Sequence, residues 1–248
     1  MAGPEAAPIR LLPEDLDPRM LADAGIDPSM IPLGLRQDTM KTFSLDLARN
    51  DPHLMVLGDT GCGKTTVLRG IVRGALASHT ADDLVIALMD VRGDLADEVP
   101  EPYLGGHAST APLARQLAES IAIELDKRQA SKVAGPRILV VIDDFDVLAA
   151  GGTEPLRPLL PYLASARDLG LNVVLTRPVL GASRAMFDMS LQALRDTGGS
   201  TLVMSGDRGE GPLLTKIFAE QMVPGRGRFV RRGAGATLVQ VARFAREE

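Results

Sequence analysis

The chain contains one cysteine, three histidines and no apolar run long enough to cross a bilayer. A single cysteine among 248 residues cannot form an internal disulfide, which suits a reducing compartment. A membrane-spanning helix needs about 20 apolar residues, and no segment approaches that length. Residues 1–8 are neither basic nor followed by an apolar core, so we do not expect them to form a signal peptide. His53, His79 and His107 are scattered and make no metal-binding motif.

The charge and the composition predict a globular domain without broad affinity for nucleic acid. The formal net charge of −5 disfavours non-specific attraction to phosphate backbones. With 45% hydrophobic residues, the chain can bury the core of one domain or at most two. We expect residues 1–8 to be a linker or an expression remnant and residues 9–248 to be one domain. One arginine-rich stretch is expected to be a solvated hairpin surface; it contains Arg226, Arg228, Phe229, Arg231 and Arg232.

Aliphatic runs alternate with helical patterns along the chain. Strands are predicted at 42–47, 53–57, 84–90, 138–142, 171–176, 201–204, 228–230 and 237–241. The run 138–142 is apolar on both faces, as expected for the middle of a parallel sheet that helices cover. This alternation predicts an α/β fold with a twisted, mostly parallel central sheet, helices on both faces and short β segments at the C-terminus.

Several helices are predicted between these strands. Leu113, Leu117, Ile121 and Leu125 recur every four residues and predict an amphipathic helix over 111–131. Further helices are expected over 67–76, 156–169 and 189–195, the second of them closed by Gly170. The proline-rich segment 9–35 is expected to be an ordered strap with a short helix that packs on the main domain.

The strongest motif is a phosphate-binding loop of the pattern G-x-x-x-x-G-K-[ST]. It is formed by Gly58, Asp59, Thr60, Gly61, Cys62, Gly63, Lys64, Thr65 and Thr66. A predicted strand precedes it and a helical pattern follows, which is the context that the motif requires and which disfavours an ordinary glycine turn. Glycines let the backbone curl around phosphates, and the helix N-terminus offers unpaired N–H groups.

The motif assigns roles in binding Mg²⁺ and ATP. Lys64 is expected to reach the β- and γ-phosphates, the Thr65 hydroxyl to ligate Mg²⁺, and Thr66 to contact the α-phosphate. Cys62 lies at a helix N-terminus, where the pKa of a thiol tends to fall. We favour the simpler interpretation that it is a small side chain filling the place of serine or alanine.

Polar residues that end two strands are expected to complete the site. Asp143 ends the aliphatic strand and is predicted to act on the Mg²⁺ side through a coordinated water. Asp144 is placed to orient the attacking water, although it is one methylene shorter than glutamate. Thr176 and Arg177 end a strand expected between the loop and Asp143, where Thr176 can sense the γ-phosphate; Arg177 serves either the site or the fold.

Hydrolysis also benefits from an arginine supplied by a neighbouring subunit. Arg128, Arg167 and Arg184 are candidates for this role, and the sequence does not choose among them.

An ordered set of motifs resembles the FtsK/SpoIIIE class of ring-forming ATPases, and within it EccC, the motor ATPase of type VII secretion. The first motifs are 11–13, 31–35 and 58–66, and the more particular ones are 143–148, 181–187, 204–207, 210–213 and 224–228. Together they span about residues 9–232. They are most similar to the last, C-terminal ATPase domain of EccC.

The resemblance implies a cytoplasmic module that is attached to the inner membrane through the secretion complex. It implies other ATPase domains of the same motor as partners, an oligomer such as a hexamer, and recognition of the C-terminal signal of secreted WXG100-type proteins. The resemblance also implies that later modules of this family often lack some of the residues needed for ATP hydrolysis. Asp144 in place of glutamate fits that departure, and the sequence 176–178 lacks a glutamine seen at this strand end in DNA-pumping relatives.

Three functions therefore remain open at the level of sequence. The first is an ATPase with weak or regulated hydrolysis that drives export. The second is a docking module that holds ATP without hydrolysing it. The third is a DNA translocase of the FtsK kind, which the acidic charge balance disfavours.

Overall fold

The computed structural model describes residues 11–21, 27, 29–214 and 216–246. The linker expected at 1–8 lies outside these residues. None of the helices in the described ranges is long and apolar enough to cross a membrane. Leu12, Leu16 and Leu21 are buried, and the last two pack with Ala242. The short helix predicted within the N-terminal strap, residues 9–35, is the 3-10 helix η1 (Pro18–Leu21).

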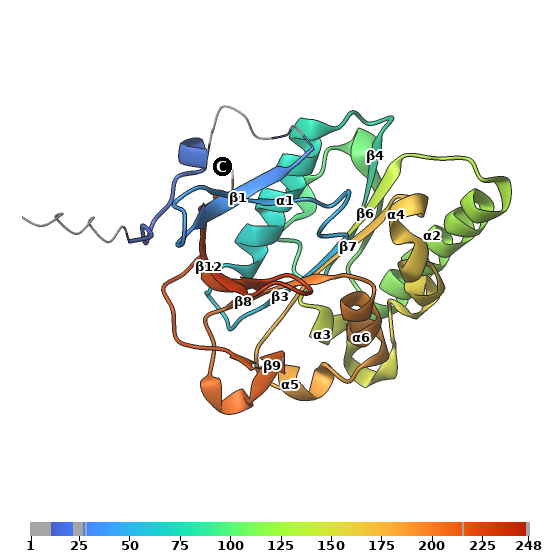
Figure 1. Cartoon of the computed structure of the whole chain (residues 1–248). Helices are drawn as coiled ribbons and strands as arrows, with labels where there is room; N and C mark the ends of the chain where they lie inside the picture. The colour runs from blue at the N-terminus through green and yellow to red at the C-terminus, as the bar shows by residue number, and fades with distance from the viewer. Residues whose placement is uncertain (1–10, 22–26, 28, 215, 247–248) are drawn as a thin grey trace, which may run out of the picture.

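A twisted ten-stranded sheet forms the centre of the described structure (Figure 1). In sheet order its strands are β2 (Thr42–Leu45), β1 (Ile31–Arg36), β12 (Ala236–Val241), β11 (Arg226–Val230), β8 (Ser200–Met204), β3 (His53–Leu57), β7 (Leu171–Arg177), β6 (Arg137–Asp143), β4 (Leu84–Asp90) and β5 (Leu104–Ala108). The six strands from β8 to β5 are parallel to one another. The predicted position of β7 between β3 and β6 is therefore confirmed.

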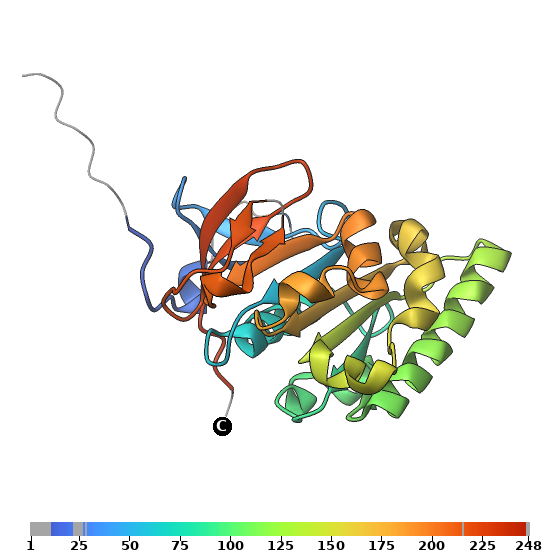
Figure 2. The ribbon, with the colours of Figure 1, turned by 90° about the horizontal axis from the view of Figure 1, so that it is seen from below.

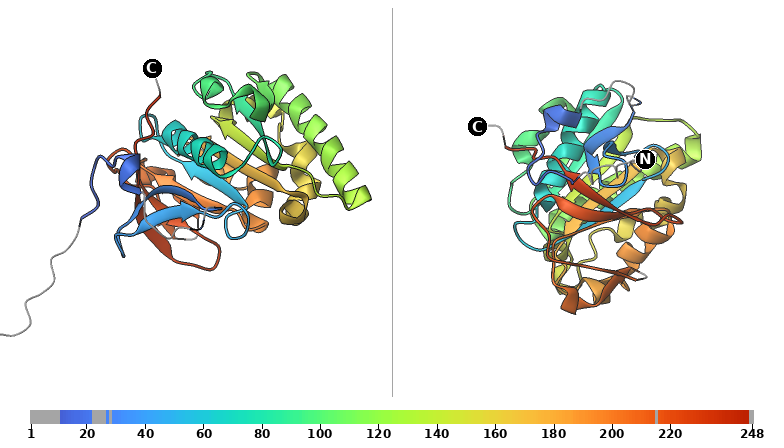
Figure 3. Two further views of the ribbon diagram at one scale, coloured as in Figure 1. Left: turned by 90° about the horizontal axis from the view of Figure 1, so that it is seen from above. Right: turned by 60° about the vertical axis from the view of Figure 1, so that its left-hand side comes forward.

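The other four strands extend the sheet in antiparallel fashion. Figure 3 shows the C-terminal strands β11 and β12 beside the N-terminal strand β1. This pairing brings the two ends of the described chain to one side of the phosphate loop. A separate two-stranded sheet consists of β9 (Pro212–Leu214) and β10 (Ile217–Phe218).

Helices cover both faces of the sheet, which confirms the predicted α/β fold. Helix α1 (Lys64–Ser78) packs its apolar residues into the core on one face. The opposite face is covered by α2 (Ala111–Ser131), α3 (Phe145–Ala149), α4 (Ala166–Leu169), α5 (Ala182–Ala185) and α6 (Met189–Asp196). Figure 2 shows α4 and α6 in front of the strands from this side. Short 3-10 helices complete the connections: η2 (Ala96–Glu98), η3 (Glu101–Tyr103), η4 (Ala150–Gly152), η5 (Arg157–Ser165) and η6 (Arg208–Glu210).

The amphipathic helix predicted over 111–131 is confirmed as α2, with one change to its buried face, and a second helix prediction needs correction. On α2 the buried apolar face is formed by Ala114, Ala118, Ile121 and Leu125, whereas Leu113 is 46% exposed. A four-residue spacing drifts around a helix of 3.6 residues per turn, so the leucine series leaves the buried face at its N-terminal end. The segment predicted as a helix over 156–169 is mostly the 3-10 helix η5 and becomes α-helical only in α4. Prolines 158 and 161 remove backbone donors there, which prevents a continuous α-helix.

Four strands were not predicted, namely β1, β5, β9 and β10. Strand β1 contains Pro32 and Gly34, residues that argue against a strand in the interior of a sheet. A bulge between these two residues accommodates the proline. A Cβ atom at Gly34 would lie 2.0 Å from the Gln240 carbonyl oxygen, so the glycine permits the close approach of β12.

Candidate functional site

The phosphate loop connects the fully buried strand β3 to helix α1. Gly63 caps the helix in a left-handed conformation, with φ 106°, which a residue with a side chain rarely adopts. A Cβ atom at Gly58 would lie 2.4 Å from the Cys62 Sγ atom. The loop therefore depends on glycine at both points. It presents the N-terminus of a 15-residue helix to the carboxyl edge of the parallel strands.

Within the loop, Lys64 folds back, and its Nζ donates to the Asp59 carbonyl oxygen at 3.3 Å. Thr60 and Gly61 are exposed at the tip. Cys62 points inward, is 4% exposed and lies 4.0 Å from the Met204 sulfur. Burial raises the pKa of the Cys62 thiol, opposite to the lowering that a helix N-terminus suggests. The side chain fills space under the loop.

Asp143 lies at the centre of a hydrogen-bond network next to the loop. Its Oδ2 atom accepts from the Thr65 hydroxyl at 2.7 Å. Its Oδ1 atom accepts from the Thr176 hydroxyl and, at 3.2 Å, from the Asp144 N–H. Burial raises the pKa of Asp143, whereas the bonds from Thr176 and Thr65 act in the opposite direction. The fold thus brings together Thr65, Asp143 and Thr176 from three elements.

These oxygens suit a magnesium–nucleotide complex. A hydroxyl and a carboxylate are ligands that Mg²⁺ prefers, and Mg²⁺ commonly takes its remaining ligands from water and phosphates. No group of three or more His, Cys, Asp or Glu residues within the described ranges could hold a metal by itself. A cation here would accordingly bind Thr65 and Asp143 together with the nucleotide.

Asp144 begins α3 in a strained conformation. Its φ and ψ of 51° and 55° lie in the left-handed region, which aspartate tolerates better than most residues. The backbone N–H donates to the Thr176 hydroxyl at 2.9 Å. The carboxylate is 17% exposed and forms an ion pair with Arg92, whose Nε lies 2.8 Å from Oδ2. Contacts of both its backbone and its side chain therefore hold Asp144 in place.

Asp90 and Arg92 belong to this site but were not predicted as site residues. Asp90 pairs with Asp143 across β4 and β6 and is 1% exposed. Its carboxylate accepts from the N–H groups of Arg92, Gly93 and Leu95 at 3.0, 2.9 and 2.7 Å. It shapes the turn that presents Arg92. An aspartate that ends an aliphatic strand was the signal used for Asp143, and the same signal marks Asp90.

Two buried polar atoms near the loop have no hydrogen-bond partner among the described residues. They are the Nε of Arg177, a residue that is 7% exposed, and the Oδ1 of Asp146. Burial is the main cause that lowers the pKa of Arg177 and raises that of Asp146. The Arg177 carbonyl accepts from the Gly58 N–H at 3.1 Å, so this residue adjoins the phosphate loop.

The three arginines considered as candidates to act on the ATP site of a neighbouring subunit have different surroundings. Arg128 is 6% exposed and donates to the Pro136 and Leu169 carbonyls at 2.8 and 3.0 Å. It supports the fold and is not available to a neighbouring subunit. Arg167 is exposed at the opposite, amino edge of the parallel strands, whereas Arg184 is exposed on α5.

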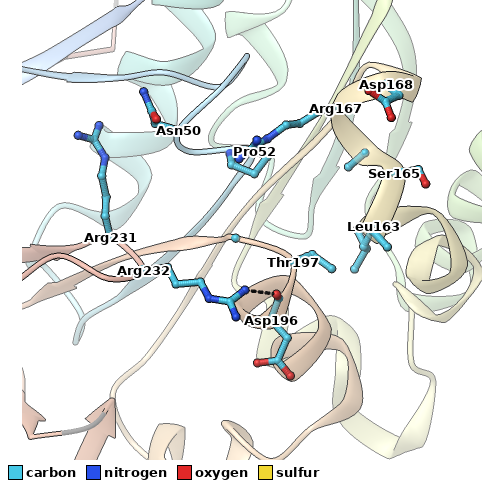
Figure 4. Close-up of a pocket in the computed structure, with 13 residues that line it drawn as sticks. Asn50, Pro52, Leu163, Ser165, Arg167, Asp168, Asp196, Thr197, Arg231 and Arg232 are labelled. Atoms are coloured by element: carbon cyan, nitrogen blue, oxygen red, sulfur yellow. Dashed lines mark hydrogen bonds between the residues drawn. The ribbon is translucent and has the colours of Figure 1, made fainter.

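The predicted basic hairpin surface is largely neutralised within the chain. Arg228 pairs with Glu220 at 3.0 Å, and Arg231 pairs with the buried Asp51 at 2.6 Å. Arg226 donates to the Leu12 carbonyl at 3.0 Å. A cavity of about 760 Å³ lies beside this surface at the amino edge of the parallel strands (Figure 4). There Arg232 donates to the Asp196 carbonyl at 2.7 Å.

Comparisons with known proteins show what the chain is similar to. The profile of the FtsK/SpoIIIE family matches residues 19–133. The chain is 38% identical over 253 residues to the ESX-4 secretion system protein EccC4 of Mycobacterium tuberculosis, covering 96% of this chain and 20% of that protein. It is 32% identical over 252 residues to the ESX secretion system protein EccC of Thermomonospora curvata, covering 97% of this chain and 19% of that protein.

Solved structures of EccC ATPase domains are also similar to this chain. The cytoplasmic domain of the Thermomonospora curvata type VII secretion ATPase EccC superposes with a TM-score of 0.89, covering 99% of this chain and 30% of that one. A structure of ATPases 2 and 3 of that EccC in complex with a signal sequence peptide superposes with a TM-score of 0.88, at 32% identity, over 99% of this chain and 46% of that one. The chain spans about a fifth of the length of the curated EccC proteins above. Residues 19–133 match the FtsK/SpoIIIE family, and the chain is similar over nearly its whole length to ATPase domains of EccC, with which it shares a P-loop ATPase fold.

Proposed function

We propose that this chain is the terminal ATPase module of a type VII secretion motor and binds ATP with Mg²⁺. Residues 58–66 hold the phosphates, with Lys64 at the β- and γ-phosphates and Thr66 at the α-phosphate. Thr65 and Asp143 hold Mg²⁺. The contact between the Thr65 hydroxyl and the Asp143 carboxylate is the observation that carries this proposal, because it joins the loop to the strand-end acid.

In this proposal hydrolysis is weak or regulated. Mg²⁺ withdraws charge from the phosphates when it is bound. Thr176 donates to Asp143 and accepts from the Asp144 amide, which fixes both residues; its role as a sensor of the γ-phosphate acts through this network. Asp144 is the residue that orients the attacking water, and Arg92 holds its carboxylate in an ion pair.

The second candidate is a module that holds ATP without hydrolysing it. The Asp144–Arg92 ion pair favours this alternative, because the guanidinium contacts the Oδ2 atom that would otherwise accept a hydrogen bond from the attacking water. A DNA translocase is disfavoured, since the arginines 226, 228 and 231 bind groups within the chain.

The proposed partners are other ATPase domains of the motor and the C-terminal signal of secreted WXG100-type proteins. A signal sequence peptide is bound in the related EccC complex, which supports this assignment. The proposed location is the cytoplasm, attached to the inner membrane through the secretion complex, in an oligomer such as a hexamer.

Calorimetry with MgATP tests nucleotide binding in the wild type, Lys64→Ala and Asp143→Asn. We expect Lys64→Ala to weaken binding by about 100-fold or more, because a charge-assisted contact to phosphate is lost. We expect Asp143→Asn to remove the benefit of added Mg²⁺. Lys41→Ala, outside the loop, is the matched control. Equal affinities of Lys64→Ala and the wild type would disprove the proposed site.

Phosphate release then separates the two candidates. Release that Lys64→Ala abolishes supports a working ATPase. Tight binding without release, with or without other motor domains, supports the non-hydrolysing module.

A further inference from the structure

The cavity of about 760 Å³ at the amino edge of the parallel strands is separate from the phosphate loop (Figure 4). Its walls come from segments that are far apart in the chain, namely 50–52, 163–168, 196–198 and 231–232. None of the phosphate-loop residues lines it. Its size falls within the roughly 300–1,000 Å³ that is typical of small-molecule sites.

Two arginines on different walls of this cavity have no carboxylate partner among the described residues. Arg167 is exposed on α4, and Figure 4 shows its side chain directed toward Pro52. Arg232 is exposed after β11, and one of its nitrogens donates to the Asp196 carbonyl at 2.7 Å. This bond holds the guanidinium in place and leaves its other N–H groups without a partner in the described structure.

The other charged groups that line the cavity are engaged elsewhere or lie at its margin. Arg231 pairs with the buried Asp51 at 2.6 Å. The Asp196 carboxylate lies 3.4 Å from Arg195 and points away from the cavity in Figure 4. Asp168 is exposed at the outer margin. The charges of the two unpaired arginines are therefore not neutralised by an ion pair within the described structure.

The uncharged lining suits the body of an organic anion. Pro52, Leu163 and Ala166 provide an apolar part of the wall, and Ser165 provides a hydroxyl. A guanidinium binds a carboxylate or a phosphate through two parallel N–H bonds. Because the two arginines come from different elements, a ligand with an acidic group at each end can use both of them.

A buried histidine beside this cavity responds to the same charge. His53 follows Pro52 and is fully buried, and its Nδ1 accepts from the Val173 N–H at 3.2 Å. Its Nε2 carries the proton of the neutral ring and has no partner in the described structure. Burial and then the charge of Arg167 lower the pKa of His53 to about 4. An anion bound at Arg167 would offset part of this effect.

We infer that this cavity is a second ligand site, which takes a small organic anion with two acidic groups, one held by Arg167 and the other by Arg232. The acidic groups are carboxylates or phosphates, which a guanidinium binds in the same way. The inference does not depend on the proposed function, because the cavity and the phosphate loop share no residue.

Nuclear magnetic resonance of the wild-type protein gives the first test, at constant ionic strength. Citrate and pyrophosphate each carry at least two acidic groups, whereas acetate carries one. The Gly198 amide reports on the cavity and the Gly61 amide on the phosphate loop. We expect citrate or pyrophosphate to shift Gly198 saturably and to bind there at least about tenfold more tightly than acetate, because acetate uses only one arginine.

The two probes also distinguish the sources of the acidic groups. A response to citrate identifies a carboxylate site and a response to pyrophosphate a phosphate site. No saturable shift of Gly198 with either probe, or shifts equal to those with acetate, would overturn the inference. A response at Gly61 alone would overturn it as well, because the anion would then occupy only the phosphate loop.

The double variant Arg167→Ala/Arg232→Ala gives the second test. We expect the affinity for the tighter probe to fall at least about tenfold, because both cationic contacts are lost. Both side chains are exposed, so the variant should fold. Arg115→Ala/Arg157→Ala, which removes the same charge outside the cavity, is the matched control, and less than about a twofold change is expected. Equal affinities of the two folded variants would contradict the inference; if the first does not fold, the wild-type titrations decide.

Discussion

At the amino edge of the parallel strands, the buried carboxylate of Asp51 is hydrogen-bonded within the chain, whereas at the carboxyl edge two charged side chains each have a buried atom without a hydrogen-bond partner in the described structure. Asp51 is fully buried and accepts from Arg231 Nε at 2.7 Å and from the Ser200 hydroxyl at 2.6 Å. At the carboxyl edge, Asp146 and Arg177 each have a buried polar atom without a partner in the described structure. Asp144 adds backbone strain there.

This difference indicates that the buried groups at the two edges of the parallel strands have different roles, one set in the stability of the fold and the other in ligand binding. Satisfied buried charges hold a structure in place, and removing one partner is costly. Strained residues and unpaired buried groups cluster where a ligand contributes the missing interactions. Mutation of the buried charges at the amino edge should therefore change the stability, and mutation at the carboxyl edge should change the binding of nucleotide.

The largest expected effect is at the amino edge. Arg231→Ala should lower the free energy of unfolding by roughly 3–5 kcal/mol, because it leaves Asp51 buried without its bidentate partner. Urea denaturation measures the change, and the affinity for ATP should stay constant. Arg228→Ala is the matched control: its pair with Glu220 is over a third exposed on each side, and less than about 1 kcal/mol is expected. Similar losses of unfolding free energy in the two variants would show that the buried ion pair at Asp51 is no more important for stability than the exposed pair at Glu220.

An effect of pH is expected from His53, a fully buried imidazole at the amino edge. Its Nδ1 accepts from the Val173 N–H at 3.2 Å, its Nε2 has no partner in the described structure, and burial lowers its pKa to about 4. The unfolded chain binds the proton more readily, so the stabilisation is complete above about pH 6.5. It should fall by about 3 kcal/mol as the pH drops to about 4.

Denaturation at several pH values checks this effect. His53→Gln should flatten the loss of stability between pH 6.5 and 4, because the titrating ring is gone. The same slope in the variant and the wild type would show that another group is responsible.

A smaller effect is expected from the strain at Asp144. Asp144→Ala and Asp144→Gly both remove the carboxylate and the pair with Arg92, so any ATP hydrolysis should fall equally in the two. Only alanine is strained at φ 51°, and it should be less stable than glycine by about 1 kcal/mol. Thermal unfolding of the two variants measures the difference, and an alanine variant as stable as the glycine one would argue against backbone strain.

Local sequence was sufficient for much of the parallel half of the molecule. Buried strands such as 138–142 are apolar on both faces, and the glycine spacing at 58–63 between a strand and a helix is typical of phosphate loops, so both are visible without tertiary contacts. The antiparallel half was harder to predict. Strand β1 contains proline and glycine, and its place beside β12 depends on a partner about 200 residues away.

The order of the elements, the phosphate loop and the acid that follows the aliphatic strand are all set by local sequence, because each depends on neighbouring residues. Long-range packing was needed to show that Arg92 pairs with Asp144, that Arg128 is buried, and that Arg167 and Arg232 line the same cavity. These contacts join residues far apart in the chain, and their geometry is set by how strands align in the sheet rather than by local pattern.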